Sequence, residues 1–85
     1  MNGNDIVIVS ATRTAIGKFG GQFATTSAIE LGTTVAKAVI QKANLSPEQI
    51  DTVIFGNVLQ AGLGQNPARQ VGLGAGLHHT STAVT

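Results

Sequence analysis

The glycine-rich stretch of residues 56–70 constrains the fold most, because it joins a strand-like segment to a helix-like one. Gly62 and Gly64 allow the backbone to turn sharply or to approach another surface closely. Asn66 can cap a helix, and Pro67 suits the first helical position, where its missing N–H would be unpaired anyway. Two glycines followed by a helix cap and a proline predict a structured loop that leads from a strand to a helix. Such loops follow the carboxyl ends of strands in α/β proteins, where binding and catalytic residues gather.

Two β-branched runs predict strands. Residues 6–9, Ile-Val-Ile-Val, are too few for a helix and predict a strand buried on both faces, as in parallel sheets. Residues 51–59 are rich in β-branched and aromatic side chains and predict a second strand. With a helix between them, the two strands would form a parallel unit. Residues 81–85 predict the start of a third strand.

The first predicted helix begins after Ser27, which has the spacing of a capping box with Glu30. The helix should end at residues 43–45, and Ser46 with Pro47 predicts one short turn after it. One half of the helical wheel is apolar, which predicts packing on a sheet. This half holds Ala28, Ile29, Leu31, Val35, Ala36, Val39, Ile40 and Ala43.

A second helix is predicted from Pro67 to about Leu77. Gly72, Gly74 and Gly76 each weaken it by up to about 1 kcal/mol relative to alanine, so its helicity should depend on packing. Close packing of helices is the interpretation of these glycines that we prefer to a ligand site.

Length and composition indicate part of a larger domain. The chain has 85 residues, 42% of them hydrophobic, and no cysteine. Domains usually hold roughly 100 to 150 residues, and a shorter chain is marginally stable without disulfides, a metal or a partner. The lack of cysteine excludes disulfides, thiolate metal sites and a cysteine nucleophile from these residues, and it fits a reducing compartment.

Charge and hydropathy argue against nucleic acid and membrane as partners. The five basic and four acidic residues give a net charge of +1 and are scattered along the chain, without a basic stripe. No apolar run approaches the roughly 18 residues that span a bilayer. The first residues include an acid where a signal peptide would carry a base. We therefore expect a cytoplasmic protein.

No cofactor, metal or catalytic motif is complete. The loop of residues 10–21 lacks the glycine spacing and the Ser or Thr of a phosphate loop. The loop of residues 62–67 lacks the third glycine of a dinucleotide site, and no acidic residue follows it. His78 and His79 are adjacent and do not share a helix face, so we interpret them as loop residues rather than metal ligands. No serine lies in a nucleophile elbow.

Three segments resemble the N-terminal end of the thiolase family. They are Val-Ser-Ala-Thr-Arg-Thr-Ala-Ile-Gly-Lys-Phe-Gly-Gly at residues 9–21, Glu-Leu-Gly at residues 30–32, and Gly-Asn-Val-Leu-Gln-Ala-Gly-Leu-Gly-Gln-Asn-Pro-Ala-Arg-Gln at residues 56–70. They occur in the family's order and spacing and cover nearly the whole chain. Within the family, the chain is similar to the acetyl-CoA C-acetyltransferases, also called acetoacetyl-CoA thiolases.

The resemblance implies an α/β protein with the thiolase-like fold, in which two similar halves form α/β/α/β/α layers. Residues 1–85 would supply the first β-α-β-α portion and the start of a third strand, which is an incomplete N-terminal domain. The implied activity is condensation of two acetyl-CoA into acetoacetyl-CoA and CoA, and the reverse thiolysis, in lipid metabolism. The enzyme would be a homo-oligomer, a dimer or a tetramer. Coenzyme A thioesters would be substrates, with no cofactor.

The resemblance also places the chemistry outside this chain. The family's nucleophilic cysteine would follow shortly after Thr85 and its activating histidine would lie in the second half, so the chain alone should be inactive. The loop resembles the family segment at the tight dimer contact. Gln65 and Arg69 are therefore expected to hydrogen-bond across that contact, with Asn66 and Arg13 in support. The alternative is that these residues form caps and ion pairs within one chain.

Two other functions stay open at this point. One is a degradative 3-ketoacyl-CoA thiolase, because the pocket that would set chain-length preference is absent from these residues. The other is a noncatalytic α/β binding module that uses the glycine loop for a phosphate or a partner.

Overall fold

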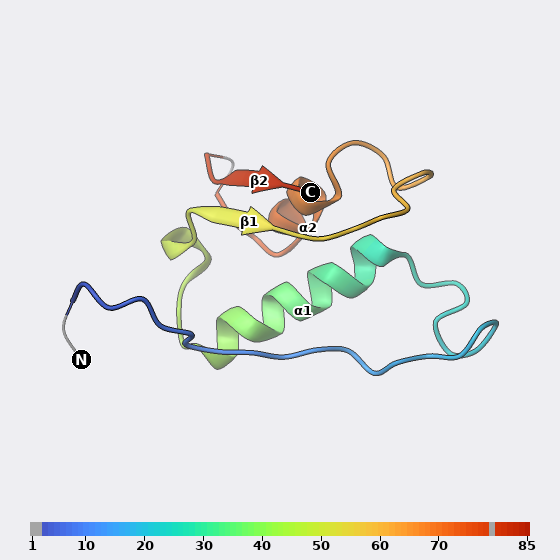
Figure 1. The fold of residues 1–85 in the computed structure, drawn as a ribbon, viewed down its shortest axis with the longest axis horizontal. Helices are drawn as coiled ribbons and strands as arrows, with labels where there is room; N and C mark the ends of the chain where they lie inside the picture. Colours follow the sequence, from blue (N-terminus) through green and yellow to red (C-terminus); the bar gives the residue numbers. More distant parts are fainter. Residues whose placement is uncertain (1–2, 79) are drawn as a thin grey trace.

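The computed structural model describes residues 3–78 and 80–85 and contains one parallel β-α-β unit beside a longer helix (Figure 1). Strand β1 (Thr52–Ile54) pairs in parallel with β2 (Thr82–Val84), and helix α2 (Pro67–Gly74) connects them. Helix α1 (Ala28–Lys42) and the short 3-10 helix η1 (Pro47–Gln49) precede β1. The described part of the chain is thus of the α/β class, as predicted.

Helix α1 begins and ends where the sequence predicts. The Ser27 Oγ accepts a hydrogen bond from the Glu30 N–H at 3.1 Å, which is the first bond of the predicted capping box. At the other end Asn44 takes a left-handed conformation with φ of 59°. The Leu45 N–H then donates to the Ile40 carbonyl at 3.2 Å, the pattern of a Schellman motif. The predicted short turn at Pro47 is also confirmed.

Helix α2 begins at Pro67 as predicted but ends at Gly74, earlier than the predicted end near Leu77. Gly76 has φ of +90°, a conformation that residues with side chains rarely adopt. The Leu77 N–H donates to the Gly72 carbonyl at 3.0 Å and closes a second Schellman motif. Gly76 therefore acts as the stop of α2 and not as a packing residue, which corrects its predicted role.

The core lies between α1, α2 and β1, where the two helices approach closely. A Cβ added at Gly32 would stand 2.8 Å from Cγ2 of Val71, and one added at Gly74 would stand 3.0 Å from Oγ1 of Thr33. Glycines at these positions let the helix backbones meet, which confirms the packing role predicted for Gly74. The buried core cluster and the half-buried residues around it are Ile40, Ala75 and Leu77 with Ala36, Val39, Leu45, Ile50 and Val53.

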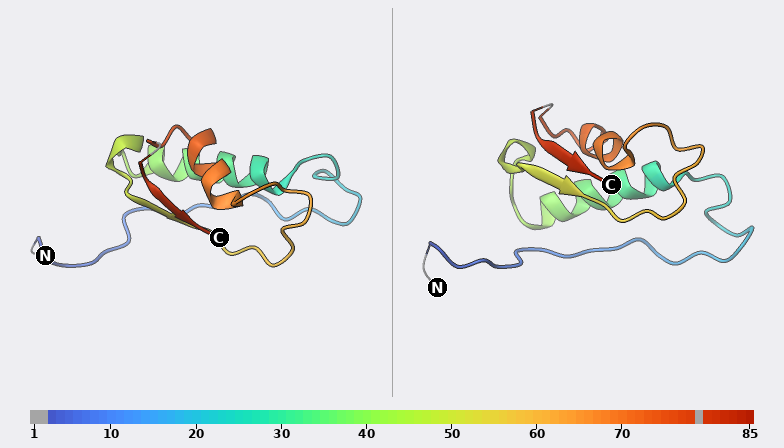
Figure 2. Two further views of the ribbon diagram at one scale, coloured as in Figure 1. Left: turned by 90° about the horizontal axis from the view of Figure 1, so that it is seen from above. Right: turned by 45° about the horizontal axis from the view of Figure 1, so that its top comes forward.

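The two-stranded sheet has one covered face and one open face. Val53 and Ala83 are half-buried, and Val53 packs against the core cluster. Ile54 and Val84, opposite each other in the register, are 74% and 56% exposed. Figure 2 shows α2 on one side of the two strands. The helices therefore cover a single face of the sheet.

The strand predicted at residues 6–9 is wrong in this structure. Ile6 and Ile8 are 101% and 89% exposed, and the segment forms no strand. Figure 1 shows it in blue as an extended stretch on the side of α1 away from β1 and β2. A strand buried on both faces needs a partner strand and two covering layers. Within the described residues the sheet is covered on one side only, so this segment finds no such place.

The strand predicted at residues 51–59 is confirmed only over Thr52–Ile54. Only three residues of β2 pair with it, so a longer strand would leave its backbone without a ladder. Val58 and Leu59 lie beyond the ladder and are 95% and 84% exposed. The parallel unit consequently runs from β1 through α2 to β2, and not from residues 6–9 through α1 as predicted. The strand predicted from residue 81 onward is confirmed as β2.

No helix within residues 3–78 and 80–85 is both long enough and apolar enough to cross a membrane.

Candidate functional site at the carboxyl edge of the sheet

The glycine loop leads from the carboxyl end of β1 to the amino end of α2 and is held by one side chain of that helix. The Gln70 Nε2 donates to the Leu63 carbonyl at 2.6 Å and to the Gln65 carbonyl at 3.0 Å. Gly64, between these two residues, has φ of +82°. The amide group of Gln70 thus uses both of its hydrogens to fix the turn. No role was predicted for Gln70, and the signal that the sequence offers for one is its place one turn after the Asn66 cap.

Asn66 joins the start of α2 to the end of β2. Its backbone is left-handed, with φ of 44° and ψ of 78°. Its Oδ1 accepts from the Arg69 N–H at 3.2 Å and from Thr85 Oγ1 at 2.8 Å, and its Nδ2 donates to the Ala83 carbonyl at 3.2 Å. Thr85 Oγ1 in turn accepts from the Ala68 N–H at 3.0 Å. We call this set of bonds between Asn66, Ala68, Arg69, Ala83 and Thr85 the Asn66 clamp.

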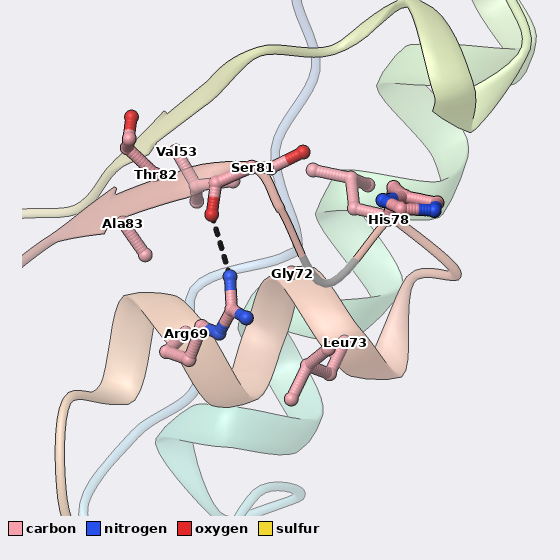
Figure 3. Close-up of a pocket in the computed structure, with 9 residues that line it drawn as sticks. Val53, Arg69, Gly72, Leu73, His78, Ser81, Thr82 and Ala83 are labelled. Atoms are coloured by element: carbon pink, nitrogen blue, oxygen red, sulfur yellow. Dashed lines mark hydrogen bonds between the residues drawn. The ribbon is translucent and has the colours of Figure 1, made fainter.

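Arg69 binds the other end of the same strand. Its Nη1 donates to the Ser81 carbonyl at 2.5 Å, as Figure 3 shows. The Ser81 Oγ donates to the Ile50 carbonyl at 2.7 Å, which ties the chain before β2 to the chain before β1. The cavity beside Arg69 measures about 10 Å³. This is room for about one water molecule, so the guanidinium packs closely against the chain that leads into β2.

A hollow of about 170 Å³ lies between the amino ends of α1 and α2 and the segment that follows β1. Ligands of α/β proteins bind outside the carboxyl ends of strands, and this hollow is at that edge. The hollow is therefore the candidate site of chemistry on this chain. Its walls include Ala28, Ile29, Phe55, Asn57, Pro67 and Val71.

The predicted site residues separate into two groups. Asn66 and Arg69 lie together, and both bind β2 within the chain, as the intramolecular alternative expects. Gln65 precedes them in the loop with an exposed side chain, and Arg13 is an exposed residue of the extended N-terminal segment. The bonds of Gln65 and Arg69 across a dimer contact stay predictions.

His78 lies in the loop after α2, the position predicted for it, and is exposed. Its Nδ1 is 2.7 Å from the Thr80 Oγ1. His79 is outside the described residues. Among residues 3–78 and 80–85, no group of three or more His, Asp or Glu side chains is placed to hold a metal ion.

The family model described as "Thiolase, N-terminal domain" matches residues 6–85. The chain is 61% identical to an acetyl-CoA acetyltransferase of Escherichia coli (strain K12) over 93% of its length and 20% of the relative's. It is 54% identical to an acetyl-CoA acetyltransferase of Clostridioides difficile over 95% of its length and 76% of the relative's.

A solved structure shows the same fold. The crystal structure of the Acat5 thiolase of Ascaris suum in complex with coenzyme A matches with a TM-score of 0.87 and 38% identity. The match covers 91% of this chain and 20% of that one. The chain thus spans about a fifth of the length of this thiolase and of the Escherichia coli relative. The family model, the relatives and the fold agree, and the chain belongs to the thiolase family, whose N-terminal domain it matches.

Proposed function

We propose that this chain is the N-terminal part of an acetyl-CoA acetyltransferase, which condenses two acetyl-CoA into acetoacetyl-CoA and CoA and catalyses the reverse thiolysis. The observation that carries the proposal is the 61% identity to the acetyl-CoA acetyltransferase of Escherichia coli over 93% of the chain. The coenzyme A in the crystal structure of the Ascaris suum thiolase supports coenzyme A thioesters as substrates.

The chain's own contribution would be a scaffold at the carboxyl edge of the sheet. The sequence has no cysteine, so a thiolate nucleophile would have to come from outside these 85 residues. What the chain supplies is the hollow between the two helix amino ends and the Asn66 clamp beside it. We therefore expect the 85-residue chain to be inactive by itself.

We further propose a homo-oligomer, a dimer or a tetramer, with Gln65 and Arg69 at its contact and Arg13 near it. The exposed side chain of Gln65 is available for such a contact. For location we propose the cytosol, and for pathway lipid metabolism. Some relatives carry the word cytosolic in their names, which supports the location.

The test is to express the complete reading frame that contains this chain and to measure its intact mass and its activity. We expect a protein several times longer than 85 residues that cleaves acetoacetyl-CoA in the presence of CoA. The 85-residue chain, purified in parallel, serves as the inactive control.

A series of 3-ketoacyl-CoA substrates distinguishes the alternatives. Preference for acetoacetyl-CoA supports the proposal, while faster cleavage of longer chains supports the degradative thiolase. A complete protein that cleaves none of them would leave the noncatalytic binding module.

A further inference from the structure

The clamp around Asn66 connects three features of the carboxyl edge. The residue directly precedes Pro67, which forms part of the wall of the hollow. Its carboxamide holds the Ala83 carbonyl and the Thr85 hydroxyl, so the end of β2 is fixed to the start of α2. The same carboxamide caps α2 through the Arg69 N–H. One side chain thus sets the relative positions of a helix amino end, a strand end and the edge of the hollow.

The hydrogen bonds of Asn66 show that its side chain, and not only its backbone conformation, is used. Two non-glycine residues of the described chain have positive φ, Asn66 at 44° and Asn44 at 59°. Glycine adopts this conformation with less strain than asparagine. Asn44 ends α1, about 22 Å along the helix from the hollow at a rise of about 1.5 Å per residue. Asn44 is therefore a matched asparagine that also has a positive φ, away from the carboxyl edge.

We propose that Asn66 is a positioning residue for acyl transfer, which acts by holding the end of β2 against the amino end of α2. The inference rests on the proposed function. Reacting groups must be held within a fraction of an ångström, and a misplacement of about 1 Å can lower a rate by about 10²-fold. Loss of the carboxamide releases two bonds to the end of β2 and one helix cap, all at the carboxyl edge of the sheet beside the hollow.

The test compares Asn66→Gly with Asn44→Gly in the complete protein encoded by the reading frame. Both variants keep the left-handed backbone accessible, and only Asn66→Gly removes the clamp. We expect Asn66→Gly to lower kcat for thiolysis of acetoacetyl-CoA by about 10- to 100-fold with KM changed less than about threefold. Asn44→Gly should leave both constants near those of the unaltered protein. An equal loss in both variants, or less than a threefold loss for Asn66→Gly, would overturn the inference.

Variants of Thr85 keep the test decisive if Asn66→Gly does not fold. Thr85→Val keeps the shape of the side chain and removes the hydroxyl that bonds Asn66 and the Ala68 N–H. Thr85→Ser keeps the hydroxyl. We expect Thr85→Val to lower kcat in the same direction and Thr85→Ser to restore it. Equal activity of the two Thr85 variants would contradict a positioning role for the clamp.

Hydrogen exchange separates failure of this inference from failure of the proposed function. If the unaltered complete protein shows no thiolysis, the proposed function is wrong, and exchange of the amides of residues 82–85 still tests the clamp. Faster exchange there in Asn66→Gly, but not in Asn44→Gly, would support the fixing of β2 by Asn66. Unchanged exchange would overturn it whatever the activity.

Discussion

The α2–β2 region and the N-terminal segment of residues 3–26 both contain β-branched residues, but only the first contains buried side chains. In α2 and β2, polar side chains hold both ends of the strand, and Ala68 and Val71 are 0% and 2% exposed. In the N-terminal segment, Ile8 and Phe19 are 89% and 107% exposed. Both regions contain β-branched runs that predict strands. The difference is that β2 lies next to a strand and a helix that hold it.

The comparison teaches that strand propensity alone does not make a strand. β2 has only three residues in the ladder, yet it is fixed by Asn66 at its end and by Arg69 at its start. The run at residues 6–9 has a stronger β-branched pattern, but it forms no strand, and its Ile6 and Ile8 side chains are exposed. Propensity in strands reflects packing against neighbours more than an intrinsic backbone preference.

The strongest test of this contrast exchanges one isoleucine of the buried core and one isoleucine of the N-terminal segment for aspartate. Ile40 is 9% exposed in the core between α1 and α2, so Ile40→Asp buries an unpaired carboxylate and should cost at least about 3 kcal/mol of unfolding free energy. Ile8→Asp, in the exposed segment, should cost less than about 0.5 kcal/mol. Urea unfolding of the 85-residue chain followed by circular dichroism measures both. Equal losses of unfolding free energy in the two variants would contradict the difference in burial between the core and the N-terminal segment.

A second test removes the guanidinium that holds the start of β2. Arg69→Met keeps the length of the side chain and loses the charged donor to the Ser81 carbonyl, so we expect a loss of about 1.5 to 2 kcal/mol. Arg13→Met removes the same charge from the exposed N-terminal segment and should change stability by less than about 0.5 kcal/mol. The difference in urea midpoint between the variants is the readout. A midpoint for Arg69→Met at or above that of Arg13→Met would show that β2 does not depend on this bond.

A third test concerns the seam where α1 meets α2. Gly32→Ala gains up to about 1 kcal/mol in helix propensity and loses about 1 to 3 kcal/mol through the contact of the new methyl with Val71, so a net loss of about 1 kcal/mol is expected. Gly56→Ala is the control, because a Cβ there would meet no atom within 4 Å. Thermal unfolding of the two variants checks the expectation. Stabilisation by Gly32→Ala would mean that the helices do not meet this closely.

The variant with the smallest expected effect on stability, Gln65→Ala, tests the proposed dimer contact. Gln65 is exposed, and its backbone carbonyl, not its side chain, accepts the bond from Gln70. Gln65→Ala should therefore change the stability of the chain by less than about 0.5 kcal/mol. In the complete protein we expect it to weaken self-association, which sedimentation at decreasing concentration measures. Unchanged association would remove Gln65 from the contact.

Local signals in the sequence predicted the helices and the loop well. Ser27, Asn66 and Pro67 are capping residues whose effect depends on the next few residues, and α1 and α2 begin where they indicate. The left-handed conformation of Gly76 depends on the geometry of the whole turn that ends α2. The residues next to Gly76 in the sequence do not indicate this conformation, so the sequence predicts a packing residue instead. Burial of residues 6–9 requires a partner strand and covering helices, which these residues do not have in the described chain. The local sequence therefore could not show whether they form a buried strand.

The glycine loop was located from the sequence, but the bonds that fix it and the residues that line the hollow were not. Residues 56–70 and the carboxyl edge of the sheet were identified from glycines and caps. The bonds of Asn66 to Ala83 and Thr85 join residues 17 and 19 positions apart, and the fixing of the loop by Gln70 depends on the path of the loop. Such pairings follow from the tertiary arrangement, which no short pattern encodes.

The most direct test of the central claim is the activity of a chimera. Residues 6–85 of this chain would replace the matching first fifth of the Escherichia coli acetyl-CoA acetyltransferase, with the corresponding segment of the Thiocystis violacea relative as matched control. If this chain serves as the N-terminal part of such an enzyme, the chimera should cleave acetoacetyl-CoA at a rate within about tenfold of the control chimera. A folded chimera without thiolysis, beside an active control, would contradict the account.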